Sequence, residues 1–306
     1  MPTFVTGRVR VSVPATSANL GPGYDSLGLA LDFRDRVTAD VTGSVAQITV
    51  TGTGADEVPL DENHLVYRAM CAAFAEMGCE VPGVRLHCEN RIPHGRGLGS
   101  SSAAIVAGIC VARGLVAGGS LLMDDDAVLT LAARLEGHPD NVAPAFFGGF
   151  TIAGTCAGTG AGQVFATTVS VDPRVNVVVF VPPDAVETRV ARGLLPEMVP
   201  HADAAANAGR AALLVAALSR EPELLMAATE DRLHQTYREP AMPRTLQLVR
   251  ELRTRGVPAV VSGAGPTVLA FADASSQAAI AAMVPDGWQA MALSVDLRGA
   301  RVDVDE

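Results

Sequence analysis

Lysine is absent from this chain of 306 residues, and all 23 of its basic residues are arginine. A Walker-type phosphate loop and a protein-kinase site both use a lysine, and pyridoxal phosphate binds to one as a Schiff base. The composition therefore excludes these three classes of protein. If the chain holds a nucleotide, backbone amides and the dipole of a helix must supply most of the positive potential.

Long apolar runs are missing as well. No run reaches the ~18 residues of a membrane span, because charges interrupt the apolar segments. The first residues, Met1 to Val5, show no basic stretch followed by an apolar core, so we expect no signal peptide and a cytoplasmic protein. The formal net charge of −10 argues against a nucleic acid or an anionic membrane as partner. It does not argue against a small phosphorylated ligand.

Cysteine is scarce, with five residues and no Cys-x-x-Cys spacing. An odd number without that spacing predicts neither a disulfide framework nor a structural zinc site. Each cysteine lies in an apolar stretch, which predicts a small buried side chain at every position. The positions are Cys71, Cys79, Cys88, Cys110 and Cys156.

Apolar residues make up 49% of the chain, enough for a substantial core and about two domains. Strands and helices are mixed without a repeating βαβ rhythm, which favours an α+β fold. The small polar stretch 154–162 is the expected junction. We therefore expect an N-terminal domain over 1–155 and a C-terminal domain over 165–306.

Hydrophobic periodicity places the elements. Val9, Val11 and Val13 alternate with polar residues and predict a strand, and the Gly/Pro-rich segment 15–25 predicts a polar loop after it. Further strands are expected at 36–41, 47–51, 84–88, 176–181, 257–262 and 267–271, and again near the C-terminus. Helices are expected at 63–77, 100–116, 124–135, 203–219, 222–235, 244–255 and 275–283.

The segment 93–103 combines three glycines with three serines and leads directly into an apolar helix. Glycine lets backbone N–H groups approach a ligand, and the first turn of a helix adds unpaired N–H donors and a partial positive charge. This combination predicts an anion site, most often for phosphate. The spacing alone also allows a plain connector between a strand and a helix. The segment consists of Pro93, His94, Gly95, Arg96, Gly97, Leu98, Gly99, Ser100, Ser101, Ser102 and Ala103.

Three other polar clusters stand out. The segment 136–144 brings carboxylates to the exit of a helix, where they can hold a hard cation and position a hydroxyl, although its residues are also those of a helix cap and turn. The segment 14–25 offers Ser, Thr, Asn and Asp side chains for a polar substrate, or forms an ordinary surface loop. The Gly-Ala-Gly-Pro segment 262–267 can approach a ligand closely, or make a tight hairpin.

Together the four clusters resemble those of the GHMP kinases, the superfamily of galactokinase, homoserine kinase, mevalonate kinase and phosphomevalonate kinase. The shared strand and loop, the Pro-x-x-x-Gly-Leu-Gly-Ser-Ser-Ser-Ala loop and the Gly-x-Gly-Pro turn occur here in the expected order. Segments 17–25 and 138–144 are similar to the homoserine kinases in particular. The resemblance implies an N-terminal domain like ribosomal protein S5 domain 2 and a ferredoxin-like C-terminal domain. It implies ATP-dependent phosphorylation of L-homoserine to O-phospho-L-homoserine, in threonine biosynthesis.

The resemblance also implies roles for single residues. The loop 93–103 would wrap the ATP phosphates, and Glu136 with Ser101 would hold Mg²⁺. Asp25 would meet the amino group of homoserine, while Arg192 and Arg238, which alone would read as surface charges, would meet its carboxylate. Catalytic roles are implied for Asn141, Glu136, Arg192 and Arg238. Substrate contacts are implied for Asn19, Asp25, His138, Asn141, Thr188, Arg192, Arg238 and Gly263, and an ATP contact for Asn63.

One departure from the superfamily concerns the catalytic base. Relatives of the mevalonate kinase type use an Asp after a Pro-Ser-Gly segment, usually beside a lysine, and this chain has neither. The corresponding position is Asn141, which cannot accept a proton at neutral pH. Asp140 is its neighbour and is expected to point elsewhere. We expect a mechanism without a protein base, in which Asn141 orients the hydroxyl, with Asp140 as base the alternative.

Two other functions stay open. A related kinase for another small alcohol, such as mevalonate or a sugar, is disfavoured by the segments that resemble homoserine kinases. A catalytically silent binding protein on the same fold is disfavoured by Glu136, because binding alone does not require a Mg²⁺ ligand. The expected partners are ATP and L-homoserine, without nucleic acid or membrane. Feedback by threonine and the oligomeric state, for which a homodimer is one option, stay open.

Overall fold

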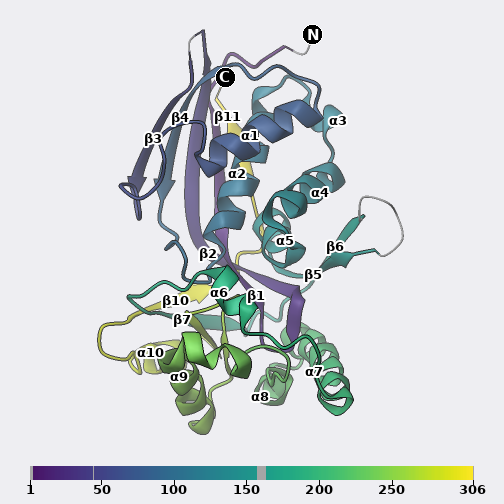
Figure 1. Cartoon of the computed structure of the whole chain (residues 1–306), viewed down its shortest axis with the longest axis vertical. Coiled ribbons are helices and arrows are strands. Elements are labelled where there is room, and N and C mark those ends of the chain that lie inside the picture. The colour runs from purple at the N-terminus through teal and green to yellow at the C-terminus, as the bar shows by residue number, and fades with distance from the viewer. Residues whose placement is uncertain (1–2, 44, 157–162, 306) are drawn as a thin grey trace.

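The computed structural model describes residues 3–43, 45–156 and 163–305, and these residues form two sheets with helices packed on them (Figure 1). In the larger sheet the strand order is β11-β1-β2-β4-β3, and β5 pairs with β2 and with β6. Among the strands of the described residues, β3 and β4 are the only parallel pair. The strands are β1 (Val9–Asn19), β2 (Gly23–Thr42), β3 (Gln47–Gly52), β4 (Gly83–Asn90), β5 (Phe150–Thr155), β6 (Val164–Val169) and β11 (Arg301–Val304).

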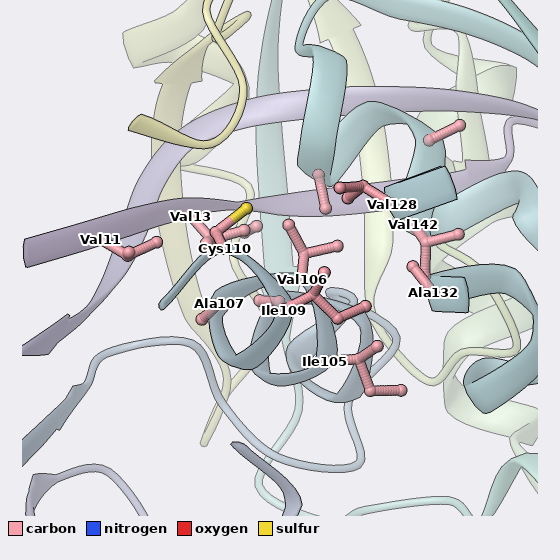
Figure 2. Close-up of a cluster of buried hydrophobic side chains, with 14 of the residues drawn as sticks. Val11, Val13, Ile105, Val106, Ala107, Ile109, Cys110, Val128, Ala132 and Val142 are labelled. Carbon is pink, nitrogen blue, oxygen red and sulfur yellow. The ribbon is translucent and has the colours of Figure 1, made fainter. Parts of the chain in front are cut away.

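Helices from the first half of the chain cover one face of this sheet (Figure 1). Among them α2 is the central one, because it is largely apolar and 11 of its 16 residues are buried. Figure 2 shows its side chains meeting Val11 and Val13 of β1, Val128 of α4 and Val142 of α5. The helices are α1 (Leu65–Glu76), α2 (Ser100–Leu115), α3 (Gly119–Leu122), α4 (Asp125–Glu136) and α5 (Pro139–Phe147).

The smaller sheet belongs to the second half and is antiparallel throughout, in the order β10-β7-β9-β8. Its core is separate and centres on Phe180, Leu246 and Trp288. The strands are β7 (Asn176–Val181), β8 (Ala259–Val261), β9 (Val268–Ala272) and β10 (Gln289–Ser294). The helices are α6 (Thr188–Gly193), α7 (His201–Ser219), α8 (Leu225–Ala228), α9 (Pro243–Thr254) and α10 (Gln277–Ala281), with short 3-10 turns at Pro222–Leu224 and Thr236–Ala241.

The α+β prediction is confirmed, and several elements lie where the periodicity predicts them. The strand 176–181 has the same bounds as β7, and the helix expected after the glycine-serine segment begins at Ser100. Asp124 caps α4 by accepting the N–H of Ala127, at 2.8 Å. The expected junction at 154–162 falls largely outside the described residues, of which 157–162 are not part.

Two predicted elements are wrong. Segment 15–25 is not a surface loop, because Ala15–Ala18 continue β1 and pair with 28–31 of β2 beyond a bulge at Pro14. Its small polar side chains are buried against other polar groups, which an alternation of apolar and polar residues does not reveal. The helix expected over 222–235 breaks up after α8. There the Asp231 carboxylate accepts the N–H groups of Leu233, His234 and Gln235, and these local bonds replace helical ones.

The cysteines are all free, as expected, but not all buried. Cys79, Cys88 and Cys110 are buried, whereas Cys71 is half-buried and Cys156 is exposed near the end of β5. Burial raises the pKa of the Cys88 and Cys110 thiols to about 12. Neither thiol is therefore a nucleophile at neutral pH.

The last strand of the chain returns to the first half. β11 pairs with β1, and Asp296, just before it, accepts the N–H groups of Arg298 and Gly299 and forms an ion pair with Arg34 of β2. The larger sheet therefore takes one strand from each end of the chain. The division into 1–155 and 165–306 stays a prediction. No helix among the described residues is both long enough and apolar enough to cross a membrane.

Candidate active site

The glycine-serine loop precedes α2 in the conformation that anion binding needs. Gly95, Gly97 and Gly99 have φ values of 64°, 74° and 69°, in the left-handed region that side-chain-bearing residues avoid. Gly99 is the N-cap of α2, and no side chain caps the helix. The first N–H groups of a 16-residue helix therefore face outward beside the loop.

A polar cavity of about 230 Å³ opens at this helix end. It collects residues from both halves of the chain, so most of the residues implied by the resemblance lie together. They are Asn19, Gly95, Gly97, Gly99, Ser100, Ser101, Glu136, His138, Asn141, Thr188, Arg192, Arg238 and Gly263. The cavity is also lined by Asp140, Val186 and Ala264, which the sequence did not single out as ligands.

Glu136 faces the start of α2 from the end of α4. Its Oε1 accepts hydrogen bonds from the hydroxyls of Ser101, at 2.6 Å, and Ser102, at 2.9 Å. Among the described residues there is no cluster of three or more His, Cys, Asp or Glu that could hold a metal alone. Mg²⁺ does not need one, since it is usually bound by one or two carboxylates together with substrate phosphates and water. Glu136 and Ser101 fit such a site.

The first turn of α5 brings three polar side chains to the cavity. His138 Nδ1 lies 2.7 Å from Oδ1 of Asp140, whose side chain is 2% exposed. Thr16 Oγ1 of β1 donates to Asn141 Oδ1, at 2.9 Å. Asp140 and Asn141 both line the cavity, and Asn141 Nδ2 lies 3.5 Å from Asp140 Oδ1. That Asp140 points away from the substrate stays a prediction. At a helix N-terminus, neighbours about 100° apart can both face one ligand.

The charge of His138 depends on these neighbours. Burial disfavours its protonated form, but the hydrogen bond to Asp140 and the negative charges of Asp140 and Glu136 outweigh burial and raise its pKa. The imidazole is therefore protonated more readily than an ordinary histidine. When protonated, it adds positive charge to the cavity that Glu136 also lines.

Arg192 of α6 is already paired. Its Nη1 and Nη2 donate to the two oxygens of Asp25, at 3.1 and 2.6 Å, and Nη1 also donates to the Tyr24 hydroxyl at 2.9 Å. Asp25 is not among the residues that line the cavity, but it is paired with Arg192, which is. The two residues expected at opposite ends of a zwitterion thus form one fork-to-fork pair.

Arg238 differs from Arg192 in its partners. Its side chain is fully buried, and its Nη1 donates to the carbonyl of Gly263 at 3.1 Å and to His234 Nδ1 at 3.0 Å. The Cζ atom of Arg238 lies 5.5 Å from the Tyr24 ring centroid, and that of Arg192 lies 5.7 Å from it. One aromatic ring therefore contacts both arginines.

Asn19, which lines the cavity, links three segments of the chain by hydrogen bonds. It lies in the left-handed region at φ 66°, and its side chain accepts the N–H of Asp25 and donates to the carbonyl of Gly263, at 2.9 and 2.8 Å. The N–H of Gly263 in turn donates to Ala18 of β1, at 3.0 Å. The turn at 262–267 is therefore fixed to the first half of the chain.

Some of the residues implied by the resemblance lie elsewhere. Pro93, His94 and Arg96 line a neighbouring cavity of about 390 Å³, and the Arg96 guanidinium donates to backbone carbonyls of His94, Pro182 and Pro183. Leu98, Ser102 and Ala103 are buried in the core. Asn63 is exposed, and its backbone N–H donates to Asp61. Nothing in these contacts assigns Asn63 to a nucleotide.

Volume alone does not identify the site. A larger cavity of about 620 Å³ lies at the C-terminal ends of α2 and α5, beside Arg113, Phe146 and Arg298. Its one carboxylate, on Asp125, is paired with Arg113 at 2.7 Å. The helix starts along it are those of the four-residue α3, after Gly118, and of α4, which the Asp124 side chain caps. It holds none of the residues that the resemblance implies, so the smaller cavity is the better candidate.

The missed contacts have a faint signature in the sequence. Tyr24 follows Gly23 in a segment that resembles homoserine kinases, and His234 lies four residues before Arg238. A spacing of three and then four residues, from Asp231 to His234 to Arg238, could have indicated one polar network. The predicted helix 222–235 contains Asp231 and His234 but ends before Arg238, so the prediction did not join the three residues.

Comparisons with known proteins agree with this geometry. The family models that match are the GHMP kinases N terminal domain, over residues 64–149, and the GHMP kinases C terminal domain, over 205–290. A homoserine kinase of Streptomyces avermitilis is 54% identical, over 98% of this chain and 97% of its own length. One from Clavibacter michiganensis is 52% identical, over 98% and 96%.

Solved structures give the same result. The crystal structure of homoserine kinase from Cytophaga hutchinsonii superposes with a TM-score of 0.82 at 26% identity, over 97% of this chain and 98% of that one. The expected two-domain GHMP kinase architecture is confirmed. From its sequence, its fold and the full length of the match, the chain belongs to the homoserine kinases of the GHMP kinase family.

Proposed function

We propose that this chain transfers the γ-phosphoryl group of ATP to the side-chain hydroxyl of L-homoserine, giving O-phospho-L-homoserine and ADP, as a step of threonine biosynthesis. The observation that carries the proposal is the composition of one cavity. A glycine loop and a free helix N-terminus form one side of it, and two arginines suited to an amino acid's carboxylate form another. Glu136 and Asn141 line the same cavity.

ATP phosphates fit the loop side. Backbone N–H groups of 95–101 and the dipole of α2 supply positive potential where the chain has no lysine. Ser101 and Glu136 would hold Mg²⁺, which when bound neutralises phosphate charge. Ser102 is buried behind them and fixes Glu136 through a 2.9 Å hydrogen bond. Its role is to orient the carboxylate, which leaves the Ser101 hydroxyl at the surface of the cavity.

Homoserine fits the arginine side. Arg238 and Arg192 would bind its carboxylate, and Asp25, already paired with Arg192, would share its charge with the substrate's amino group. Thr188 is exposed at the start of α6, where it lines the cavity beside Arg192. With the amino-acid end held there, the side-chain hydroxyl points toward the loop.

Asn141 orients that hydroxyl. Because Thr16 donates to Oδ1, the amide nitrogen Nδ2 is left as the free end, with only a long 3.5 Å contact to Asp140. Nδ2 donates to the attacking oxygen and leaves its lone pair directed at the γ-phosphorus. The oxygen forms the new bond to phosphorus as the bond to the β–γ bridging oxygen breaks and ADP leaves. The proton leaves to a phosphate oxygen or to water, since phosphoryl transfer depends mainly on positioning and charge stabilisation.

ADP release tests the proposal directly. The purified chain is incubated with ATP and Mg²⁺, together with L-homoserine, mevalonate or galactose, or without an acceptor. We expect release that depends on homoserine, with phosphate recovered on the side-chain oxygen. Preferential use of another alcohol would select a different kinase of the same fold. Nucleotide binding without turnover of any acceptor would indicate a silent binding protein.

A further inference from the structure

Arg238 is a buried cation without an acidic partner. Its side chain is 1% exposed, and no carboxylate among the described residues lies within ion-pair distance of it. Its Nε atom is buried and has no hydrogen-bond partner. A buried charge in this state is costly unless a ligand compensates it. Arg192 differs, because Asp25 already balances its charge. Of the two arginines, Arg238 therefore has the less compensated positive charge and attracts an anion more strongly.

His234 is the side chain that holds Arg238 in place. Its imidazole is fully buried, with Nε2 at 2.7 Å from the carbonyl oxygen of Gly21. A carbonyl only accepts, so Nε2 carries the proton and Nδ1 presents a lone pair. That lone pair accepts from Arg238 Nη1, at 3.0 Å. The Tyr24 ring packs beside the imidazole, with 5.3 Å between ring centroids.

An imidazole suits this position better than a carboxylate. A carboxylate would align the guanidinium equally well, but it would also cancel its charge. A neutral histidine aligns Arg238 and leaves the positive charge for a ligand. We propose that His234 is a positioning residue that aims Arg238 at the carboxylate of the amino-acid substrate. The inference rests on the proposed function, because it needs a substrate carboxylate at Arg238.

Four charged or titratable groups face His234. Asp231 Oδ1 lies 3.7 Å from Nε2, Arg238 lies at Nδ1, and Asp25 and Tyr24 approach from β2. Burial lowers the pKa of His234, and the charge of Arg238 lowers it further, against the opposing effect of Asp231. Protonation would remove the Nδ1 acceptor and place a second cation beside Arg238. The neutral form is therefore the one that can position the arginine.

Two conservative variants separate the two ends of the imidazole. In His234→Gln the side-chain amide reaches the place of Nε2 and can still donate to Gly21, but the Nδ1 acceptor is lost. In His234→Asn the amide oxygen takes the place of Nδ1 and the bond to Gly21 is lost. We expect KM for homoserine to rise about tenfold or more in His234→Gln, the cost of one hydrogen bond to a charged group, with kcat and KM for ATP nearly unchanged. In His234→Asn we expect KM within about threefold of wild type, since an acceptor is kept.

A substrate without the carboxylate supplies the control. 3-Aminopropan-1-ol is homoserine lacking that group, so its kcat/KM should be the same in the wild type and in His234→Gln. Melting temperatures establish that the variants are folded. An unchanged KM for homoserine in a folded His234→Gln protein, or an equal loss with both alcohols, would overturn the inference.

The wild type offers a second measurement, which does not depend on how the variants fold. The ratio of kcat/KM for homoserine to that for 3-aminopropan-1-ol should stay constant between about pH 8 and pH 6.5 and fall only below that range, because burial holds the pKa of His234 below its ordinary 6.5. A ratio that already falls above pH 6.5 overturns the inference alone. A wild type without homoserine-dependent turnover overturns the proposed function and the inference with it.

Discussion

Asp140 and Asn141 are neighbours that line one cavity, and their contacts indicate different roles. Asp140 is buried and accepts from His138, whereas Asn141 keeps a free amide nitrogen. We expect Asn141→Ala to lower kcat about 10- to 100-fold, because the hydroxyl loses its orientation. We expect Asp140→Asn to raise KM for homoserine through His138 and to change kcat less. Steady-state kinetics with both substrates varied measures the two effects.

A larger loss of kcat in Asp140→Asn than in Asn141→Ala would instead support Asp140 as the catalytic base. A selective loss of about 10²-fold or more in kcat for Asp140→Asn is the size expected when a general base is removed. Full turnover in Asn141→Ala would exclude Asn141 from the reaction. Ser219, whose hydroxyl bonds to the backbone of its own helix α7, offers a control position, and Ser219→Ala should leave both kinetic constants unchanged.

The raised pKa of His138 also predicts how stability varies with pH. A group whose pKa is higher in the folded state than in the unfolded one stabilises the fold fully below its ordinary pKa of 6.5. That stabilisation is lost as the pH rises through the raised value. Urea unfolding of the wild type and His138→Gln should therefore differ most near about pH 5.5 and least near about pH 8.5. A difference that grows with pH would contradict the assigned interaction with Asp140.

At the residue scale, the sequence identified the groups that a motif carries and missed those that only contacts define. Glu136 and Asn141 stand in recognisable segments, and both line the cavity. Tyr24 contacts both arginines and His234 contacts Arg238, where β2 packs against the segment after α8. The spacing from Asp231 to Arg238 records part of that network, but no local pattern predicts that Tyr24 joins it. The sequence indicated Asp25, but not its pairing with Arg192, because the two residues lie 167 positions apart along the chain.

At the scale of elements, strong apolar periodicity was sufficient for β7 and for the start of α2. It failed where polar side chains are buried. Thr16 and Ser17 are 0% exposed inside β1 because Asn141 and Ser262 bond to them, so a buried strand has the composition of a loop. It also failed at α5, where Pro139 suggested a turn although proline is favoured at the first position of a helix.

The packing of α2 gives a prediction at this scale. A Cβ added at Gly108 would lie 2.2 Å from the carbonyl oxygen of Val66 in α1, too close without a shift of backbone. Gly108→Ala should therefore lower the free energy of unfolding by about 1–3 kcal/mol, as overpacking does. Gly209 in the exposed face of α7 has nothing within 4 Å of its added Cβ.

Gly209→Ala is accordingly the matched control. It should raise the free energy of unfolding by about 0.5–1 kcal/mol, since alanine is the better helix former and restricts the unfolded chain. Urea unfolding should show that the free energy of unfolding falls in Gly108→Ala and rises in Gly209→Ala. Two stabilised variants would mean that α1 and α2 are not packed as closely as the structure has them.

At the scale of the whole molecule, the site exists only where the two halves meet. The Ser262 hydroxyl lies 2.6 Å from the carbonyl of Gly97, to which it donates, and 2.8 Å from the Ser17 hydroxyl. The N–H of Thr16 donates to Leu98, at 3.0 Å, so β1, the phosphate loop and the 262–267 turn form one unit. Sequence patterns predicted each segment, but their contact depends on the arrangement of two sheets, which local periodicity does not contain.

Gly97 tests this unit. Its φ is 74°, so any residue that replaces it must adopt an unfavourable left-handed conformation. A Cβ added at Gly97 would also lie 2.3 Å from the carbonyl oxygen of Ser262 and 2.7 Å from that of Gly265. Gly95, at φ 64°, meets only the Ala185 methyl, at 3.2 Å. Gly95→Ala should therefore cost about 1–2 kcal/mol of stability, the cost of conformation alone, and Gly97→Ala more.

The two variants should also differ in function. Gly97→Ala displaces the phosphate loop from the turn that carries Gly263, the acceptor for both Asn19 and Arg238. It should raise KM for ATP and for homoserine together, whereas Gly95→Ala should act on ATP alone because its contact lies away from the turn. If Gly97→Ala raised only KM for ATP, the two halves would bind their substrates independently. A rise in KM for both substrates would mean that one glycine in the left-handed region couples the nucleotide site to the acceptor site.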